Sequence, residues 1–237
     1  MPASDFTTTL GAVASVEGWM TDAQARRLWD ASSALRPPAT IVEIGSFQGR
    51  STIVLATAAA PGVEVVAIDP HAGNDRGPQE LEGFADAARG DHDAFVANLE
   101  AAGVRHRVRH LRAFSSDALA DVAGEIDVLY IDGAHRYRPA LEDIRRWGER
   151  VRDGGTLLVH DSFSSVGVTL AILSSLLLDG RFTYVGRSAS LAEYRRNPPL
   201  SRRGNAGRQL AQLPWFARNV VLKALIVTKL RKGDWPY

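Results

Sequence analysis

The stretch Thr40-Ile-Val-Glu-Ile-Gly-Ser-Phe-Gln-Gly-Arg-Ser-Thr52 decides the fold, because it combines signals for a strand, a turn and a helix. The apolar run at 41–44 is rich in β-branched residues, which is typical of a buried parallel strand. Gly45 and Gly49 then allow the backbone to turn sharply and to approach a ligand closely. A helical pattern resumes over 51–60, and the free N–H groups at its start would face that ligand.

Glu43 and Asp69 are the informative charges around this turn. Glu43 places a carboxylate in a buried strand, where an unpaired charge is costly and therefore implies a partner. The turn also lacks the G-x-G-x-x-G pattern that delivers a pyrophosphate to a helix N-terminus. A carboxylate beside the turn would repel phosphate and favour a cation, such as the ammonium and sulfonium part of S-adenosylmethionine. Asp69 ends the following strand, where its side chain can accept hydrogen bonds from both ribose hydroxyls.

Length and composition limit the possible architectures. A chain of 237 residues with 45% hydrophobic content is expected to form one globular α/β domain with a full core. The absence of cysteine excludes disulfides, thiolate metal sites and a cysteine nucleophile. We find neither a signal-peptide pattern at the N-terminus nor an apolar run long enough to span a bilayer, so we expect a soluble, cytoplasmic protein.

Strand and helix signals alternate along the chain, which favours a parallel sheet with helices on both faces. An N-terminal arm over 4–18 precedes them, and a polar segment at 71–91 is expected to be a loop or lid. The expected strands are 41–44, 63–68, 108–114, 126–131 and 156–159, followed by an antiparallel hairpin of 182–185 and 190–194. The expected helices are 22–34, 51–60, 92–102, 115–122, 139–151 and 167–178, the first of them opened by a Thr21–Gln24 capping box.

Unusual polar residues fall at the carboxyl ends of these strands, which is where ligands bind in open parallel sheets. They are Glu43, Asp69, Ser115, Asp132, His160 and Asp161. Their shared location predicts one binding site along that edge of the sheet.

Four linked motifs make residues 17–195 resemble class I S-adenosylmethionine-dependent methyltransferases. They are V-E-I-G-S-x-x-G-R-S-T, I-D-P-H, I-D-G-x-H-x-Y and G-G-x-x-x-x-H-D-S. The resemblance implies a Rossmann-like fold with a mostly parallel seven-stranded sheet in the order 3-2-1-4-5-7-6, the seventh strand antiparallel. It also implies that the cofactor is bound by Glu43, Gly45, Ser46, Gly49, Ser51, Asp69, Phe114, Ser115, Ser116 and Asp132.

Asp132, His135, His160 and Asp161 form a second group of candidate residues. Carboxylates and imidazoles at neighbouring strand ends could hold an octahedral Mg²⁺ or Mn²⁺ ion. The pattern resembles metal-dependent O-methyltransferases, including those that act on sugar hydroxyls, and the resemblance implies Asp132 and Asp161 as metal ligands. His160 is a third candidate ligand by its residue type and position. The chain departs from those relatives in having His160-Asp161 where they have Glu-Asp, and in having Ser162 where catechol-type relatives have Asn.

The same residues also allow ordinary structural roles. Asp132 could cap the following helix, and His135 could be a surface imidazole bonded to Tyr137 or Asp143. His160 could be a core histidine with satisfied hydrogen bonds. We favour the functional interpretation, in which Asp132 and His135 are catalytic and His135 is the general base.

The resulting functional hypothesis is methyl transfer from S-adenosylmethionine to a sugar or glycan hydroxyl, polarised by a divalent ion and deprotonated by an imidazole. A metal-independent or catechol-type small-molecule O-methyltransferase is the nearest alternative. A noncatalytic nucleotide-binding scaffold is the alternative from another class.

The C-terminal segment differs in charge from the rest of the chain. From Pro198 onward there are eight Lys or Arg residues and a single Asp. We therefore divide the chain into a methyltransferase domain with an N-terminal helical arm, 1–197, and a basic amphipathic helical extension, 198–237. Pro198-Pro199, Gly204 and Gly207 indicate a linker, followed by an amphipathic helix over 209–230. Such a helix favours a homodimer or packing on its own domain over membrane contact, and nucleic-acid binding is not expected.

Overall fold

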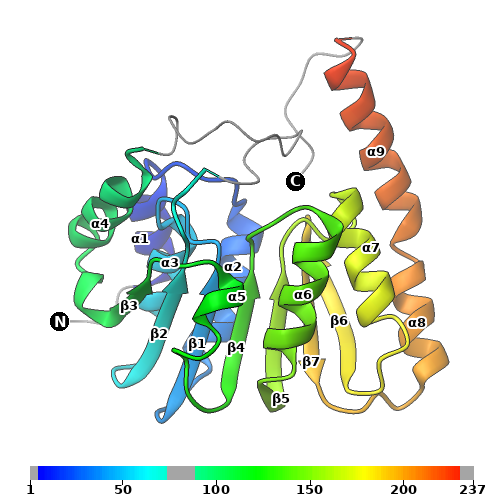
Figure 1. The fold of residues 1–237 in the computed structure, drawn as a ribbon, viewed down its shortest axis with the longest axis horizontal. Coiled ribbons are helices and arrows are strands. Elements are labelled where there is room, and N and C mark those ends of the chain that lie inside the picture. The colour runs from blue at the N-terminus through cyan, green and yellow to red at the C-terminus, as the bar shows by residue number, and fades with distance from the viewer. Residues whose placement is uncertain (1–4, 74–88, 230–237) are drawn as a thin grey trace.

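The computed structural model describes residues 5–73 and 89–229, which form a seven-stranded sheet flanked by helices (Figure 1). The strands lie in the order β3-β2-β1-β4-β5-β7-β6. Strands β1 to β5 pair in parallel, whereas β7 is antiparallel to both β5 and β6. Strand order and direction therefore match the sequence prediction. The strand bounds are β1 Ala39–Ile44, β2 Val63–Ile68, β3 Val108–Leu111, β4 Ile126–Ile131, β5 Val151–Val159, β6 Phe182–Ser188 and β7 Leu191–Arg196.

The helices connect these strands. Their bounds are α1 Phe6–Val13, α2 Asp22–Ser33, α3 Arg50–Ala58, α4 Asp91–Ala101, α5 Ser115–Ala118, α6 Tyr137–Gly148, α7 Val166–Ser175, α8 Arg202–Leu210 and α9 Leu213–Val227, with a short 3₁₀ turn at Arg105–Arg107. Among the described residues, no helix is long and apolar enough to cross a membrane.

Successive side chains of each strand point to opposite faces of the sheet, so a hydrophobic layer forms on each face. In β1, Ile41 packs into the layer formed with α1 to α4, whereas the adjacent Val42 packs into the layer formed with α5 to α7. Both side chains are completely buried. Burial on both faces explains why the central strands are continuous apolar runs without polar alternation.

The start of α2 is fixed by the predicted capping box. Thr21 accepts a hydrogen bond from the backbone N–H of Gln24, and the side chain of Gln24 accepts one from the backbone N–H of Thr21. This reciprocal pair satisfies two N–H groups that have no partner within the helix. It also orients Gln24 towards the centre of the molecule.

The N-terminal helical arm contains α1, which is capped by Asp5. One segment near the C-terminus differs from the sequence expectation. The linker expected around Gly204 and Gly207 is instead helix α8, and this prediction was wrong. The side chain of Asn205 holds α8 on edge strand β6 by accepting from the N–H of Tyr184 (2.8 Å) and donating to the carbonyl of Phe182 (3.0 Å). Tertiary packing therefore outweighs the low helix propensity of glycine.

The loop or lid expected at 71–91 lies largely outside the described residues, which omit 74–88. The two ends of that segment are described. His71 follows β2, and α4 begins at Asp91.

Candidate active site

Backbone hydrogen bonds align the carboxyl ends of the parallel strands. The residue that follows each strand donates its N–H to the carbonyl of the last residue in the neighbouring strand. These bonds join Asp69 to Leu111 (3.2 Å), Gly45 to Ile68 (2.9 Å), Asp132 to Ile44 (2.8 Å) and His160 to Ile131 (2.9 Å). The predicted site residues are thereby placed in one row, as the rule for open parallel sheets requires.

Gly45 makes the turn after β1 possible. Its φ of 86° lies in the left-handed region, and a Cβ atom there would lie 2.3 Å from the carbonyl oxygen of Asp132. The backbone after β1 therefore passes directly against the backbone after β4. Only glycine fits both the conformation and the space.

Asp69 connects two loops at the end of β2. One carboxylate oxygen accepts from the N–H of Phe47 (2.8 Å), and the other accepts from the N–H of His71 (2.7 Å). Each carboxylate oxygen can accept more than one hydrogen bond, so both retain capacity for a ligand. Asp69 therefore shapes the turn after β1 and also presents acceptors to the cavity that it lines.

Glu43 has a different position from the one expected. Its side chain is completely buried and accepts hydrogen bonds from the hydroxyls of Ser51 and Thr52 at the start of α3. Burial raises the pKa of Glu43 to about 8, although the two hydroxyls act in the opposite direction. The carboxylate thus has the partner that its burial implied, but that partner is helix α3 and not a ligand in the cavity.

A cavity of about 1100 Å³ lies above the strand ends. It is slightly larger than the volume of about 300–1,000 Å³ that is common for small-molecule sites. The predicted cofactor residues in its wall are Gly45, Asp69, Phe114, Ser115, Ser116 and Asp132. The other four, Glu43, Ser46, Gly49 and Ser51, do not line it and instead lie behind the turn.

One end of the cavity has a flat, largely apolar wall held by buried polar contacts. Phe114 is 46% exposed towards this space, and Ile68 and Trp147 also line it. The hydroxyl of Ser115 donates to Asp143 (2.5 Å), and the indole N–H of Trp147 donates to the carbonyl of Ser115 (3.3 Å). These contacts fix a slot of the kind that a planar heterocycle requires.

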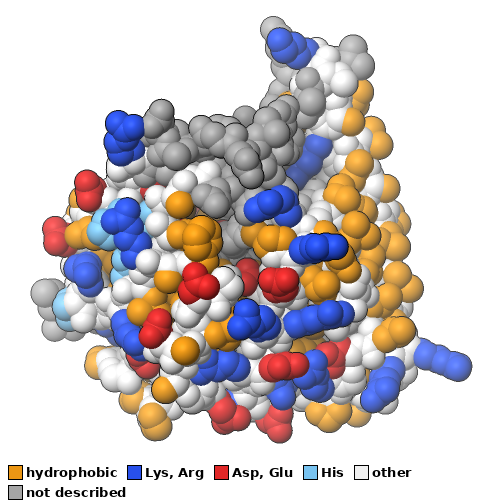
Figure 2. All heavy atoms as spheres, viewed as in Figure 1, with side chains coloured by type: hydrophobic (Ala, Val, Ile, Leu, Met, Phe, Trp, Pro, Cys, Tyr) orange, Lys and Arg blue, Asp and Glu red, His pale blue; other side chains and the backbone are white. Residues whose placement is uncertain are grey.

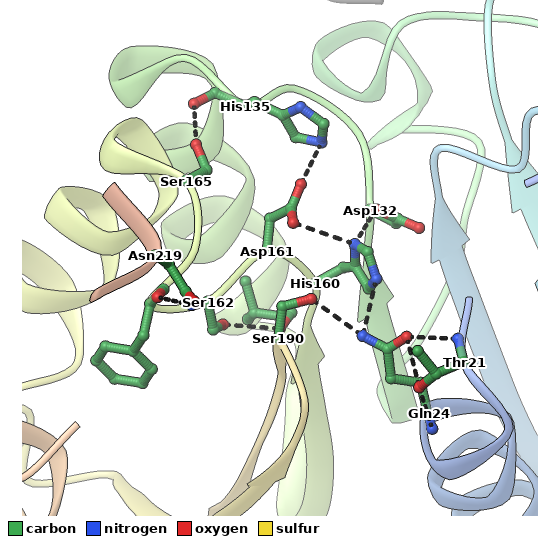
Figure 3. A network of polar contacts seen from close by, with 12 residues as sticks. Thr21, Gln24, Asp132, His135, His160, Asp161, Ser162, Ser165, Ser190 and Asn219 are labelled. Carbon is green, nitrogen blue, oxygen red and sulfur yellow. Dashed lines mark hydrogen bonds and ion pairs between the residues drawn. The ribbon is translucent and has the colours of Figure 1, made fainter. Parts of the chain in front are cut away.

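His135 and Asp161 form an imidazole–carboxylate pair at the opposite end. Nε2 of His135 lies 3.0 Å from Oδ2 of Asp161, and the other ring nitrogen points away from the carboxylate (Figure 3). The pKa of Asp161 lies below its ordinary value. Burial acts to raise this pKa, but the nearby His135, His160 and Lys223 lower it by more, so the carboxylate stays ionised. The alternative partners Tyr137 and Asp143 are not the groups that His135 contacts here.

His160 is almost completely buried between a carboxylate and an amide. Its Nδ1 lies 2.9 Å from Oδ1 of Asp132, and its Nε2 lies 3.2 Å from Nε2 of Gln24. Burial lowers the pKa of His160, and the carboxylates of Asp132 and Asp161 raise it by more. Asp132 also accepts a hydrogen bond from the hydroxyl of Tyr130 (2.7 Å).

The donor atoms of Asp132, His160 and Asp161 do not fit the expected divalent ion. Oδ2 of Asp132 accepts from the hydroxyl of Tyr130, Oδ1 of Asp132 lies beside Nδ1 of His160, and Oδ2 of Asp161 lies beside Nε2 of His135. Among the candidate ligand atoms of these three residues, Oδ1 of Asp161 and Nδ1 of His160 are buried without a hydrogen-bond partner, although Nδ1 lies at ion-pair distance from Asp132. Within 5–73 and 89–229, no group of three or more His, Asp or Glu side chains is arranged to hold a metal.

The sequence did not indicate several residues that shape the cavity. The rings of Trp19 and Phe47 are stacked, with 5.4 Å between their centroids, in the part of the cavity wall near the turn after β1. Helix α9 contributes Val220, Lys223 and Ala224 to the opposite wall. The C-terminal extension therefore contributes residues to the cavity wall. The division of the chain at residue 198 did not predict this contribution.

Helix α9 reaches the cavity because its first half is anchored on the domain. The side chain of Asn219 is buried and donates to the carbonyl of Phe163 (3.3 Å), and the guanidinium of Arg187 lies 3.8 Å from the ring centroid of Trp215. The outer surface of α9 is strongly apolar (Figure 2) and includes the exposed Val221, while Leu210 is exposed at the end of α8.

Comparisons with known proteins agree with this geometry. Residues 42–162 match a family model described as a methyltransferase domain. Among solved structures, the O-methyltransferase TomG from Streptomyces achromogenes, in complex with SAM, is 18% identical, with a TM-score of 0.57 over 84% of this chain and 93% of that chain. An O-methyltransferase from Bacillus cereus in complex with SAH is 16% identical, with a TM-score of 0.57 over 83% and 93%. The O-methyltransferase NovP is 17% identical, with a TM-score of 0.61 over 74% and 80%.

The matched residues 42–162 begin in β1 and end just after His160-Asp161. They contain the glycine turn, Asp69 and both imidazole–carboxylate pairs. The structural neighbours share this fold. This chain is therefore an enzyme of the methyltransferase family that the model describes, and it has the class I S-adenosylmethionine-dependent methyltransferase fold.

Proposed function

We propose that this methyltransferase transfers a methyl group from S-adenosylmethionine to a hydroxyl oxygen, with His135 as the general base. The observation that carries this proposal is the distance of 3.0 Å between Nε2 of His135 and Oδ2 of Asp161, in the wall of the same cavity as Gly45 and Asp69. Solved relatives of the same fold include O-methyltransferases in complex with SAM and SAH.

The cavity suits S-adenosylmethionine in size and in the chemistry of its wall. The carboxylate of Asp69 is suited to the ribose hydroxyls, and the slot beside Phe114 is suited to the adenine ring. Gly45 lets the main chain approach the methionine part without a side chain in between. The bound cofactor supplies an electrophilic methyl group on a sulfonium sulfur.

Asp161 prepares His135 for proton transfer. The ionised carboxylate favours a proton on Nε2 of His135, which leaves the lone pair on Nδ1 available to the acceptor. Nδ1 takes the hydroxyl proton as the acceptor oxygen forms its bond to the methyl carbon. The carbon–sulfur bond breaks at the same time, and its electron pair stays on sulfur, so the products are the methyl ether and S-adenosylhomocysteine. General-base catalysis of this kind contributes about 10²–10⁴-fold.

A sugar hydroxyl remains our proposal for the acceptor. The support comes from the resemblance of the Asp132–His135 and His160-Asp161 motifs to sugar-modifying enzymes. The exposed faces of Trp19 and Tyr137 in the cavity wall, 47% and 39% exposed, offer flat apolar surfaces for a ring. A catechol-type acceptor would use the same surfaces, so the test must include both classes.

The proposal is tested by incubating the purified full chain with methyl-labelled S-adenosylmethionine and a panel of acceptors. The panel contains glycosides with free vicinal hydroxyls, catechols, and matched compounds whose hydroxyls are already methylated. We expect a labelled methyl ether and equimolar S-adenosylhomocysteine only where a hydroxyl is free, and no transfer by His135→Gln. Transfer to nitrogen or carbon acceptors alone would contradict the proposal.

We further propose that the chain forms a homodimer through the apolar outer surface of α9 and the end of α8. Leu210 and Val221, 43% and 56% exposed, support this surface as a contact. Light scattering after gel filtration should give twice the mass of 25.7 kDa for the wild type and a lower mass for Val221→Asp. A monomeric wild type at micromolar concentration would contradict this proposal.

A further inference from the structure

Gln24 lies in a fixed orientation because its oxygen is already committed. Its Oε1 accepts from the backbone N–H of Thr21 (2.7 Å) and lies 3.1 Å from the hydroxyl of Thr21. A backbone N–H can only donate, so the amide cannot be turned over without placing two donors against each other. The NH₂ group of Gln24 must therefore face the core.

In the core, this NH₂ group meets His160 and Ser190 (Figure 3). Nε2 of Gln24 lies 3.2 Å from Nε2 of His160 and 3.0 Å from the hydroxyl oxygen of Ser190. All three residues are buried. The amide nitrogen of Gln24 can only donate a hydrogen bond. Nε2 of His160 must therefore accept with its lone pair, which places the ring proton on Nδ1.

The opposite side of the ring leads to the same assignment. Nδ1 of His160 lies 2.9 Å from Oδ1 of Asp132 and 3.9 Å from Oδ1 of Asp161. An Nδ1 lone pair would face two carboxylates across a buried space and be repelled. The carboxylates also favour a second proton on the ring, and that proton would be on Nε2. There it would face the N–H donor of Gln24 in a buried position, and two donors in contact without an acceptor cost free energy.

We propose that Gln24 is a positioning residue that keeps the proton of His160 on Nδ1, so that His160 acts as a donor towards Asp132 and cannot be a metal ligand. A metal ligand must offer a lone pair, and the ring has its lone pair turned towards Gln24. The place that the third ligand of a divalent ion would occupy is therefore filled by an N–H group. His160 therefore cannot complete a ligand set with Asp132 and Asp161, and we expect methyl transfer to proceed without a divalent ion; this last step alone rests on the proposed function.

The proton position can be measured by long-range ¹H–¹⁵N NMR of histidine rings in the full chain, with His160 assigned by its loss in His160→Gln. We expect a wild-type ring protonated on Nδ1 only at pH 7.5. In Gln24→Glu, the carboxylate still accepts from Thr21 and so preserves the capping box, but it cannot donate to His160. We therefore expect protons on both ring nitrogens in that variant.

Gln24→Met serves as the neutral comparison, since it neither donates nor accepts at this position. We expect the single wild-type pattern to be lost there, while thermal melts show whether all variants remain folded. A wild-type ring with a proton on Nε2 would overturn the proposal. The same pattern in all three folded proteins would also overturn it, because Gln24 would then have no influence on the ring.

Metal binding is tested separately with Mn²⁺ as the probe. We expect the electron paramagnetic resonance signal of free Mn²⁺ to be unchanged by an equimolar amount of wild-type protein saturated with S-adenosylhomocysteine. We also expect unchanged transfer in excess chelator. Stoichiometric Mn²⁺ binding that is lost in Asp161→Asn would overturn the metal-free assignment. Failure to find an acceptor would affect only the proposed function, because neither the NMR nor the Mn²⁺ measurement uses one.

Discussion

Nε2 of His135 lies 3.0 Å from Oδ2 of Asp161, and this pair joins the loop after β4 to the loop after β5 at one end of the cavity. The backbone of Asp161 has a φ of 54°, which is unusual for a residue with a side chain. Its carbonyl accepts hydrogen bonds from the N–H groups of Ser164 and Ser165, which hold this conformation. The carboxylate is thus aimed at His135 by the loop itself.

Asp161→Asn should separate the effect of Asp161 on His135 from any effect on cofactor binding. The amide keeps the shape of the carboxylate but loses the charge that favours a proton on Nε2 of His135. We expect kcat to fall about 10²–10⁴-fold while cofactor affinity changes little. The measurement is steady-state transfer combined with calorimetric titration of the cofactor. A variant that retains more than half of the wild-type kcat would remove Asp161 from the proposed mechanism.

Gly45→Ala should disrupt both the fold and the cofactor site. The left-handed conformation costs a residue with a side chain about 1–3 kcal/mol, and the new Cβ would also overlap the carbonyl oxygen of Asp132. We expect a lower midpoint of urea unfolding and loss of cofactor binding. The matched control is Gly186→Ala in β6, where φ is not positive and no heavy atom lies within 4 Å of the added Cβ. Equal behaviour of the two variants would refute the role given to Gly45.

A cluster of histidines beside the cofactor site should make stability depend on pH. Nε2 of His71 lies 3.1 Å from Nε2 of His110, and His92 packs against both rings. Burial, followed by the charges of His71, His92, Arg105 and Arg112, lowers the pKa of His110 to about 4 from an ordinary value of 6.5. Burial also lowers the pKa of His71, with Asp69 and Asp91 acting in the opposite direction.

Because these pKa values are lower in the folded state, the unfolded chain takes up protons first as the pH falls. Stability should therefore be retained above pH 6.5 and lost progressively as the pH falls towards 4. In His110→Phe, the decline in unfolding free energy between these values should be shallower. Urea unfolding at several pH values measures this directly, and parallel curves for the two proteins would contradict the assignment to His110.

Asn205→Ala should show that α8 belongs to the domain. Removal of the side chain leaves the buried N–H of Tyr184 and carbonyl of Phe182 without their partners, at a cost of about 1–3 kcal/mol. Arg203→Ala, on the exposed side of the same helix, is the control. Chemical unfolding of both variants checks the prediction. If Asn205→Ala lowers the free energy of unfolding by no more than Arg203→Ala does, this segment is better described as a linker.

The parts of the structure that sequence could predict depend on local signals. The turn at Gly45 is visible because apolar residues stop where glycine begins, and the Thr21–Gln24 capping box follows from spacing alone. The second role of Gln24 was not predictable, because its contact with His160 joins residues that are 136 positions apart. The same holds for Lys223, which reaches the cavity only through the packing of α9.

Glu43 shows where a correct physical premise led to the wrong partner. A buried carboxylate does require a partner, but Ser51 and Thr52 in the next helix supply it from the protein itself. Likewise, Asp132, His160 and Asp161 are adjacent as expected, yet Asp132 pairs with His160 and Asp161 pairs with His135. Residue types predicted the place of the site, whereas the direction of each hydrogen bond required the structure.

Calorimetric titration with S-adenosylhomocysteine of the wild type, Asp69→Asn and His135→Gln is the most direct test of the account as a whole. Asp69 accepts from two backbone N–H groups and faces the cavity, so replacing one of its oxygens with an NH₂ group should weaken binding by about tenfold or more. His135→Gln should bind as the wild type does, with one site per chain, and should fail to transfer a methyl group. No binding to the wild type, or equal losses in both variants, would contradict a methyl-donor site at Asp69 that is separate from a base at His135.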